Sequence, residues 1–196
     1  MTAGNKALPL RSLIALAGLL AALPGGSDAA TGADQGHLGL VLEGAFEAGG
    51  DNVAKVFYAN GDTQNIRAGQ GGTLSIGAHY QLADSPLDFM ATVGYKFIRT
   101  ADYHTDLGID RVVFKFVGSW ALGNGWWINA GPVLHTDTRF NGDGFVPDIR
   151  FDDAVGGTVG FGWRWIGLTY TNIQYHSPIT GSLDASNGGI SFTWKF

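Results

Sequence analysis

Three residues near the end of the chain are of the types that acyl transfer requires. His176 and Ser177 are adjacent, and Asp184 follows close behind them. A serine nucleophile, a base that takes its proton and a carboxylate that orients the base form the usual set for this chemistry. In a strand, however, adjacent side chains point to opposite faces, and Pro178 follows directly. We therefore expect no joint role for these residues and no catalytic site.

An acidic segment, residues 136–150, offers oxygen atoms that suit a divalent cation. It contains Asn141-Gly142-Asp143-Gly144, and carboxylate and carbonyl oxygens are the ligands that Ca²⁺ prefers. The segment lacks the regular alternation and the final Glu of an EF-hand loop, so we interpret it as a solvated loop and expect no metal. The chain has no Cys, which excludes thiolate sites and disulfides. The residues concerned are Asp137, Asn141, Asp143, Asp148, Asp152 and Asp153.

The elements that would position such groups show alternating apolar and polar side chains. In residues 188–196, Ile190, Phe192, Trp194 and Phe196 occupy every second position. An extended chain places these four on one face and small or polar groups on the other. Such an exposed edge invites aggregation in water, whereas lipid accepts its apolar face once the strands close into a barrel. The pattern therefore predicts a strand in contact with a membrane.

This last strand carries a resemblance to a known class. A final Phe196 preceded by aromatic or apolar residues at alternate positions is similar to the C-terminal signal of bacterial outer-membrane β-barrels. The resemblance implies recognition by the barrel-assembly machinery through this strand. It also implies export through the periplasm, residence in the cell outer membrane and contact with its lipid and lipopolysaccharide.

The same alternation recurs along the chain and predicts an all-β fold of eight strands. Short turns are expected near residues 84, 123 and 165, and long connections near 60, 104, 143 and 180, which is typical of a transmembrane antiparallel β-barrel. Asn60-Gly61 lies between two extended runs and predicts an extracellular hairpin extension. Size and strand number resemble the OmpA, OmpX and OmpW group. The predicted strands are 37–47, 73–82, 87–97, 111–120, 126–135, 151–164, 166–175 and 188–196, with polar loops at 99–110, 136–150 and 176–182.

The first residues have the features of a secretory signal peptide. Lys6 and Arg11 precede an apolar run over 13–23, and Ser27-Asp28-Ala29 suits a cleavage site. The run is about half of the roughly 20 residues that a spanning helix needs. We therefore predict a signal peptide at residues 1–29 and a barrel domain at 30–196. The remainder holds 10 basic and 16 acidic residues, which makes it a poor nucleic-acid binder.

The inward positions of the predicted strands carry charges of both signs. Because an eight-stranded barrel is narrow and filled by its own side chains, we expect these groups to form ion pairs that plug the lumen. A gated path for water or small solutes through the same network is the alternative. The predicted network comprises Glu43, Glu47, His79, Lys96, Arg111, Lys115, Asn129, Arg164 and Lys195.

Aromatic residues next to the short turns predict an interfacial belt. Amphipathic rings of this kind settle at headgroup depth in membrane proteins. Ligand stacking is the competing interpretation. The belt comprises Trp120, Trp126, Trp163, Trp194 and Phe196.

The sequence thus predicts a monomeric outer-membrane barrel with a structural or surface-interaction role and no cofactor. A narrow channel or carrier for small or hydrophobic molecules, as in the OmpW group, is the first alternative. Lipid A acyl hydrolysis is the second: lipid A deacylase is an outer-membrane barrel of similar size. Its His and Ser lie one residue apart on a late strand, whereas His176 and Ser177 are adjacent.

Overall fold

The computed structural model describes residues 36–57, 63–102, 105–144 and 147–196. The predicted signal peptide and the Asn60-Gly61 turn lie outside these ranges. Within them, the regular elements are β-strands. No helix in the described part of the chain has the length and apolar character needed to cross a bilayer.

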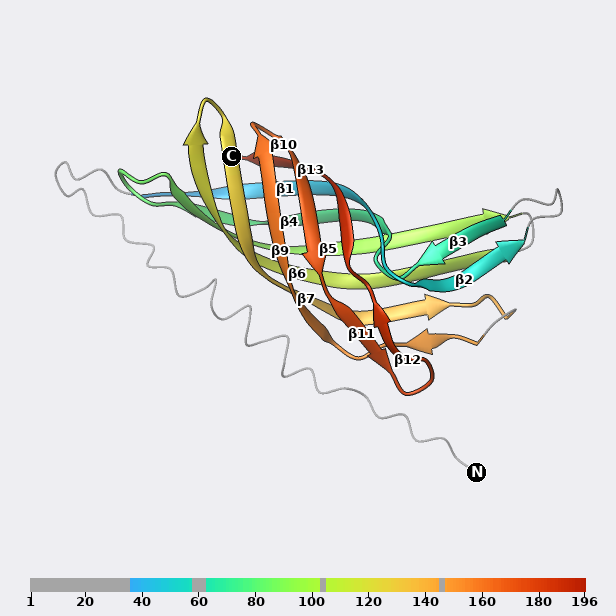
Figure 1. The fold of residues 1–196 in the computed structure, drawn as a ribbon. Coiled ribbons are helices and arrows are strands. Elements are labelled where there is room, and N and C mark those ends of the chain that lie inside the picture. Colours follow the sequence, from blue (N-terminus) through green and yellow to red (C-terminus); the bar gives the residue numbers. More distant parts are fainter. Residues whose placement is uncertain (1–35, 58–62, 103–104, 145–146) are drawn as a thin grey trace. The chain divides into compact units, whose positions relative to one another are not determined.

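Among the described residues, eight strands close into an antiparallel ring (Figure 1). The order around the ring is β6-β5-β4-β1-β13-β10-β9-β7, and β7 pairs with β6 to complete it. The prediction of an eight-stranded antiparallel barrel is therefore confirmed. The strands are β1 (His37–Ala48), β4 (Gly71–Gln81), β5 (Leu87–Asp102), β6 (Thr105–Gly123), β7 (Trp126–Asn141), β9 (Ala154–Trp163), β10 (Ile166–Asn172) and β13 (Asn187–Lys195).

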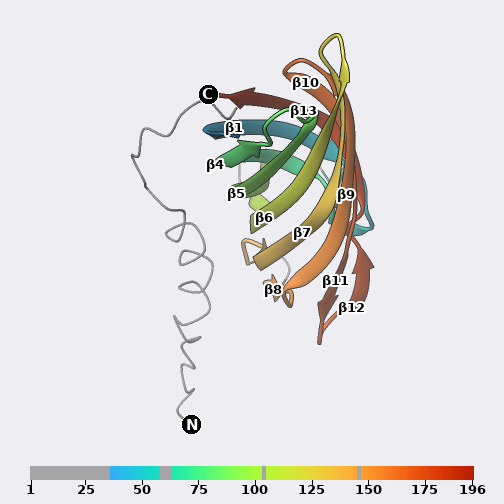
Figure 2. The same cartoon turned by 90° about the vertical axis from the view of Figure 1, so that its left-hand side faces the viewer.

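Alternation along each strand decides which side chains face inward. In β1, Val41, Glu43 and Ala45 are buried, whereas Leu42 and Phe46 between them are exposed. The period of two puts the polar and small residues in the lumen and the large apolar ones outside. Figure 2 shows the strands side by side along one curved sheet. The barrel therefore has the reverse of the pattern of a water-soluble sheet, whose apolar face is buried.

One end of the barrel carries the short turns and the last residue. The turns centre on Asp84, Asn124 and Arg164, which have positive φ angles of 49°, 53° and 53°. Tight hairpin turns require such angles because they match the twist of the strands they join. Leu40 in β1 donates its N–H to the carbonyl oxygen of Phe196 at 3.1 Å. The start of the first strand and the last residue therefore lie side by side at this end. We call this the turn end.

The opposite end extends further than the sequence indicated. β5 and β6 continue as a paired ladder to Asp102 and Thr105, so the prediction of a polar loop over 99–110 is wrong. β7 likewise runs to Asn141 and pairs with β8 (Ile149–Arg150), which shortens the predicted loop over 136–150. Past the part of the barrel whose outer wall is apolar, the strands keep their hydrogen bonds although their side chains no longer alternate. The periodic signal therefore stops before the strands do.

Two further hairpins stand at the end of the barrel opposite the turn end, which we call the hairpin end. β2 (Asn52–Phe57) pairs with β3 (Thr63–Arg67) as the predicted hairpin extension, in a small sheet of its own. β11 (Gln174–Ser177) pairs with β12 (Gly181–Asp184), where a loop over 176–182 was predicted. The predicted seventh strand over 166–175 is interrupted at Ile173, between β10 and β11, close to where its alternation falters. The predicted sixth strand starts three residues late, at Ala154.

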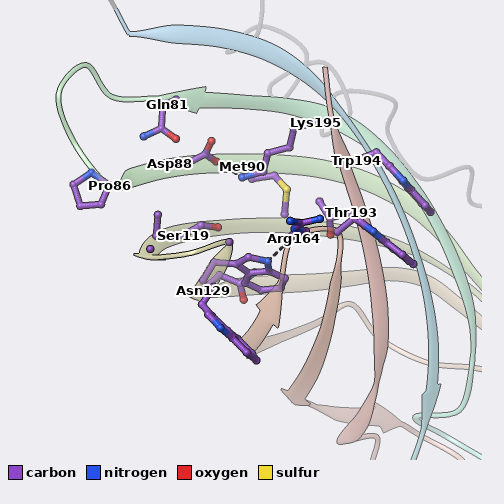
Figure 3. Close-up of a pocket in the computed structure, with 16 residues that line it drawn as sticks. Gln81, Pro86, Asp88, Met90, Ser119, Asn129, Arg164, Thr193, Trp194 and Lys195 are labelled. Carbon is purple, nitrogen blue, oxygen red and sulfur yellow. Dashed lines mark hydrogen bonds and ion pairs between the residues drawn. The ribbon is translucent and has the colours of Figure 1, made fainter.

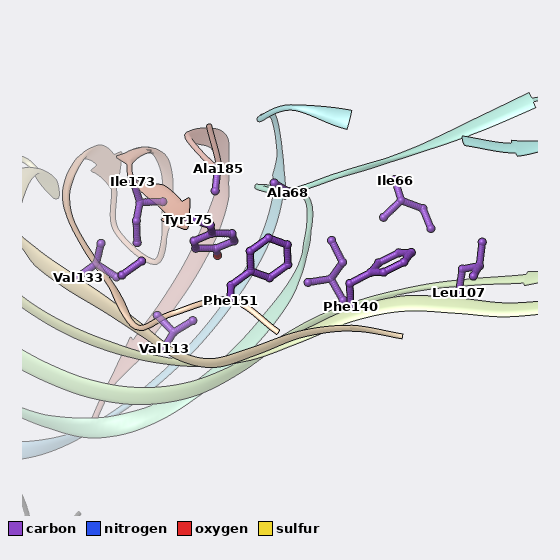
Figure 4. Close-up of a cluster of buried hydrophobic side chains, with 12 residues drawn as sticks. Ile66, Ala68, Leu107, Val113, Val133, Phe140, Phe151, Ile173, Tyr175 and Ala185 are labelled. Atoms are coloured by element: carbon purple, nitrogen blue, oxygen red, sulfur yellow. The ribbon is translucent and has the colours of Figure 1, made fainter. Parts of the chain in front are cut away.

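A cluster of buried apolar side chains joins these hairpins to the barrel (Figure 4). It brings together Ile66 from β3, Phe140 from β7 and Tyr175 from β11. These side chains are 2% exposed or less, as in the interior of a soluble protein. The hairpin end is therefore covered by packed side chains. The cluster also contains Ala68, Leu107, Ile109, Val113, Val133, Phe151, Ala154, Ile173 and Ala185.

Candidate functional site

Two ion pairs cross the middle of the lumen. Lys96 Nζ lies 2.9 Å from Glu47 Oε2, and Thr73 donates its hydroxyl to the same oxygen at 2.9 Å. Lys115 donates to both carboxylate oxygens of Glu43. The partners come from β1 on one side and from β5 and β6 on the other, so alternation alone brings them into one lumen. Each of these four charges has a partner of opposite sign, which offsets the cost of removing it from water.

Arg111 on β6 lies opposite Lys96 in the register of β5 and β6. Its guanidinium donates to the carbonyl oxygens of Ala68 at 2.8 Å and Gln70 at 2.9 Å. It also lies 5.7 Å from the ring centroid of Tyr175, in cation–π range. Arg111 is 1% exposed. It thereby fixes the segment between β3 and β4 and the β11–β12 hairpin onto the barrel wall.

The space left among these groups is small. A cavity of about 40 Å³ is bordered by Glu43, Glu47, Lys96 and Lys115. A water molecule needs about 10–15 Å³ of such volume, so only a few waters fit. The free volume beside the two ion pairs is therefore small.

Tyr175 of the β11–β12 hairpin lies beside Arg111. Its hydroxyl lies 2.6 Å from His135 Nδ1, and its ring centroid lies 5.6 Å from that of Phe151. The break at Ile173 and Ala185 turns the β11–β12 hairpin so that this side chain enters the barrel. The Tyr175 side chain is 1% exposed, so its ring is buried between the hairpin and the barrel wall.

A third polar group lies nearer the turn end. His79 Nδ1 lies 2.8 Å from Asp88 Oδ2, and Lys195 Nζ lies 3.2 Å from Asp88 Oδ1. His79 and Asp88 are buried, whereas the Lys195 side chain is 38% exposed. Asp88 thus neutralises Lys195 at the edge of the lumen. Of the predicted network, Glu43, Glu47, Lys96, Lys115 and Arg111 lie at mid-height, and His79 and Lys195 lie here.

A larger hollow opens at the turn end (Figure 3). Its volume is about 460 Å³, and Met90, Asn129, Trp127 and Lys195 are among its lining residues. Trp127 faces inward from β7, and its indole Nε1 donates to the carbonyl oxygen of Arg164 at 2.9 Å. We call this hollow the vestibule. Its volume falls in the range of about 300–1,000 Å³ typical of small-molecule pockets.

Three glycines make room for the Trp127 ring. A Cβ at Gly160, Gly162 or Gly167 would lie 3.4, 2.3 or 2.5 Å from the nearest Trp127 ring carbon. These glycines face inward from the neighbouring strands β9 and β10, so the indole lies flat against bare backbone. Any larger residue there would push the ring into the hollow.

Arg164 lies in the turn between β9 and β10 at the vestibule rim, apart from the mid-height ion pairs. Its side chain is exposed, and its guanidinium carbon lies 4.5 Å from the ring centroid of Trp163. A turn position with a positive φ points its side chain out of the strand alternation, which explains the difference from the predicted placement. Asn129 borders the same hollow from β7.

The three catalytic candidates do not come together. Ser177 is fully buried and its Oγ accepts from the N–H of Ile179, whereas His176 on the opposite face is exposed and contacts Ser182 at 3.3 Å. Asp184 accepts from the N–H of Ser186 at 2.8 Å, and hydrogen bonds first from the Ser186 side chain and then from this N–H lower the pKa of the Asp184 carboxyl. The alternation of β11 thus separates the nucleophile from its base.

The acidic segment is held by its own hydrogen bonds. The N–H of Gly142 donates to Asp148 Oδ1 at 2.9 Å, and the N–H of Asp143 donates to Asn141 Oδ1 at 3.1 Å. Over the described ranges, no three His, Cys, Asp or Glu side chains gather as a metal site.

The five residues of the predicted aromatic belt are exposed on the outer surface. Trp165, which the prediction omitted, joins them: its ring centroid lies 6.2 Å from that of Trp194 and 5.8 Å from that of Phe192. All lie toward the turn end. The exposed belt residues are Trp120, Trp126, Trp163, Trp194 and Phe196.

The chain was compared with family models, with curated proteins and with solved structures. No family model matches the chain, and no curated protein matches its sequence. Among solved structures, the fold is similar to Ail, the attachment invasion locus protein of Yersinia pestis, in a crystal structure with the heparin analogue sucrose octasulfate. The TM-score is 0.43 at 6% identity, over 82% of this chain and 99% of that chain.

Proposed function

We propose that this protein is a monomeric integral β-barrel of a bacterial outer membrane that presents hairpins at the cell surface. It has a closed lumen and no enzymatic activity. The proposal includes contact with outer-membrane lipid and lipopolysaccharide, and insertion by the barrel-assembly machinery through β13.

The observation that carries the proposal is the inverted distribution of side chains. Leu40, Phe46 and Val155 are 63%, 72% and 74% exposed on the outer wall, whereas Lys96 and Arg111 inside are each 1% exposed. Large contiguous apolar surfaces are rare on soluble monomers. A closed barrel also leaves no unpaired strand edge, which a lipid environment demands. Hydrocarbon is therefore the solvent that suits this outer wall.

The belt and the turns favour one orientation. Short turns face the periplasm in bacterial barrels, and longer connections face outward. The turn end, with its exposed indole rings, then lies at the inner leaflet. The hairpin end, where β2–β3 and β11–β12 stand, faces the outside. Packed side chains there offer a firm surface for a partner.

The filled lumen argues against a channel. A solute would have to displace the ion pairs of Glu43 and Glu47 and the Tyr175 ring, all of them packed or hydrogen-bonded. We expect no stepwise conductance above the bare bilayer when the refolded protein is placed in planar membranes. Regular conductance steps would favour the channel alternative.

The membrane assignment is tested directly by refolding. The chain without residues 1–29 should fold in phosphatidylcholine vesicles, show β-rich circular dichroism and migrate differently on gels before and after boiling. In plain buffer it should aggregate. A stable, detergent-free monomer in buffer would contradict the proposal.

The absence of enzymatic activity has its own test. Cells that express the protein and cells that express Ser177→Ala should contain identical lipid A species by mass spectrometry. A deacylated species that disappears with Ser177→Ala would show the hydrolase alternative to be correct.

A further inference from the structure

We infer that the vestibule binds an anionic amphiphile, with its phosphate or carboxylate on Arg164 and its apolar body against Trp127. This inference rests on the proposed membrane location, because such a ligand reaches the turn end from the inner leaflet or from the periplasm. It concerns a site at the end of the barrel opposite the surface hairpins.

The first step of the argument is the way in which two turns hold Arg164. Its N–H donates to the carbonyl oxygen of Gly125 at 2.7 Å, and its own carbonyl accepts from Trp127 Nε1 at 2.9 Å. The indole of Trp163, beneath the guanidinium, is itself tied to the carbonyl of Asn124 at 3.1 Å. The backbone and the stacking partner of Arg164 are thus fixed from both sides.

The second step is that the charge itself is left available. No carboxylate of the described residues pairs with the Arg164 guanidinium. Stacking on Trp163 uses the face of the guanidinium, whereas its N–H donors lie in the plane and remain free. A planar fork of donors suits a carboxylate or phosphate.

The third step is the balance of charge around the hollow. Its charged lining residues are Asp88, Arg164 and Lys195. Asp88 is already engaged by Lys195 and His79, so the positive charge of Arg164 is not offset within the lining. The chain as a whole has a formal charge of −5, so the net positive charge of the vestibule lining is opposite in sign to that of the whole molecule. An anion is therefore the favoured occupant.

The fourth step is the apolar part of the lining. One face of the Trp127 ring rests against the backbone of β9 and β10, and the ring also borders the hollow together with Met90. Trp165 and Trp194 of the outer belt border the same hollow, so it opens toward headgroup depth. A molecule with a charged head and an apolar body meets both kinds of surface at once.

The test uses the refolded barrel in micelles of a non-ionic detergent, with ¹⁵N-labelled tryptophan. The indole N–H signals of Trp127 and Trp163 report on the site because both flank Arg164. Decanoate and decanol form a matched pair that differs in charge. Dihexanoylphosphatidylglycerol supplies a lipid headgroup, and inorganic phosphate supplies the anion alone.

We expect decanoate or the phosphatidylglycerol to shift both signals saturably, and decanol to leave them unchanged. Arg164→Asn, which tolerates the left-handed turn position, should raise the half-saturating concentration about tenfold or more, as for loss of a charge-assisted contact. Arg164→Lys should retain part of the binding. Arg150→Gln, an exposed arginine at the hairpin end, is the control and should change nothing.

Several outcomes would overturn the inference. Equal shifts with decanol would show that charge plays no part, and equal shifts with phosphate alone would show that the apolar body plays none. Unchanged binding in both Arg164 variants would remove the proposed anchor. A stronger response to phosphatidylglycerol than to decanoate identifies a lipid headgroup as the source, and the reverse identifies a free fatty carboxylate. A barrel that folds but binds nothing contradicts this inference alone, whereas failure to fold in micelles contradicts the proposed function.

Discussion

The ion pair between Glu47 and Lys96 should add little net stability as a pair, yet removing only one of its partners should cost heavily. The Lys96 side chain is 2% exposed and that of Glu47 is 12% exposed, with 2.9 Å between the charged atoms. Removing one partner of a buried pair leaves the other charge uncompensated, which costs about 3–5 kcal/mol. The small cavity beside the pair admits water, so we expect the lower value, about 3 kcal/mol, for Glu47→Gln or Lys96→Met alone.

The double variant should recover most of this loss. With neither charge present, the lumen contains neutral groups of similar volume, and replacements of this kind are often close to neutral. We therefore expect Glu47→Gln with Lys96→Met to lie within about 1 kcal/mol of the unaltered protein. The assay is equilibrium unfolding by urea in phosphatidylcholine vesicles, followed by tryptophan fluorescence. From the four proteins, a double-mutant cycle gives the coupling free energy.

An exposed ion pair provides the control for the effect of burial. Arg139 and Asp137 form an ion pair at the hairpin end in which both side chains are half exposed. Solvent screening should reduce their coupling to about 0–1 kcal/mol. If the losses at Glu47 and Lys96 simply add, or if their coupling is no larger than that of the surface pair, the lumen is not a low-dielectric plug and the argument fails.

Three further outcomes follow from the same structure. Gly162→Val should destabilise the barrel by about 1–3 kcal/mol through overpacking, measured by the same urea unfolding, because its Cβ would lie 2.3 Å from an indole carbon. Tyr175→Phe should leave His135 without its 2.6 Å partner and cost about 1–3 kcal/mol, with faster hydrogen exchange in β11–β12. The Asp184 carboxyl, whose folded pKa is lowered by Ser186, should support the local hairpin above its unfolded pKa and lose that support as the pH falls through the folded value, which NMR titration of the Ser186 amide would report.

Each of these outcomes has a comparison. Gly157→Ala adds a Cβ where no atom lies within 4 Å, so it should leave stability unchanged. Tyr170→Phe removes an exposed hydroxyl from the outer wall of the barrel and should leave hydrogen exchange in β11–β12 as it was. An Asp184→Asn protein whose Ser186 amide still titrates over the same pH range would show that another group causes the effect.

Alternation of side chains was enough to predict the barrel, because every strand of the ring has one face toward the lumen and one toward the outside. It located the strands, the short turns and the inner face that carries Glu43, Glu47 and Lys96. It could not tell where β5 and β6 end, since their ladder continues past Arg99 without a lipid-facing pattern. Backbone hydrogen bonds extend a hairpin whatever its side chains are, so the alternation does not mark where the strands end.

The vestibule was harder to foresee. Alternation placed Trp127 inside but did not indicate what it contacts. The side chains that lie next to it depend on the register between adjacent strands, and the sequence of a single strand does not determine that register. A signal was nevertheless present: Gly160, Gly162 and Gly167 occupy inward positions, where a narrow barrel usually needs filling. Such a gap predicts a large side chain from an adjacent strand. The sequence placed Arg164 among the charges of the lumen. The structure places it in a turn with a positive φ angle, where the alternation of a strand no longer decides the side to which a residue points.

The apolar cluster at the hairpin end limits how this surface can diversify. Ile66, Phe140 and Tyr175 come from three separate hairpins yet share one interior, so a change in any of them disturbs the other two. Sequence drift on this side of the molecule should therefore concentrate at the hairpin tips, while the three anchors either persist or change in concert. Grafting a foreign loop onto this scaffold would succeed only if the graft begins beyond those anchors.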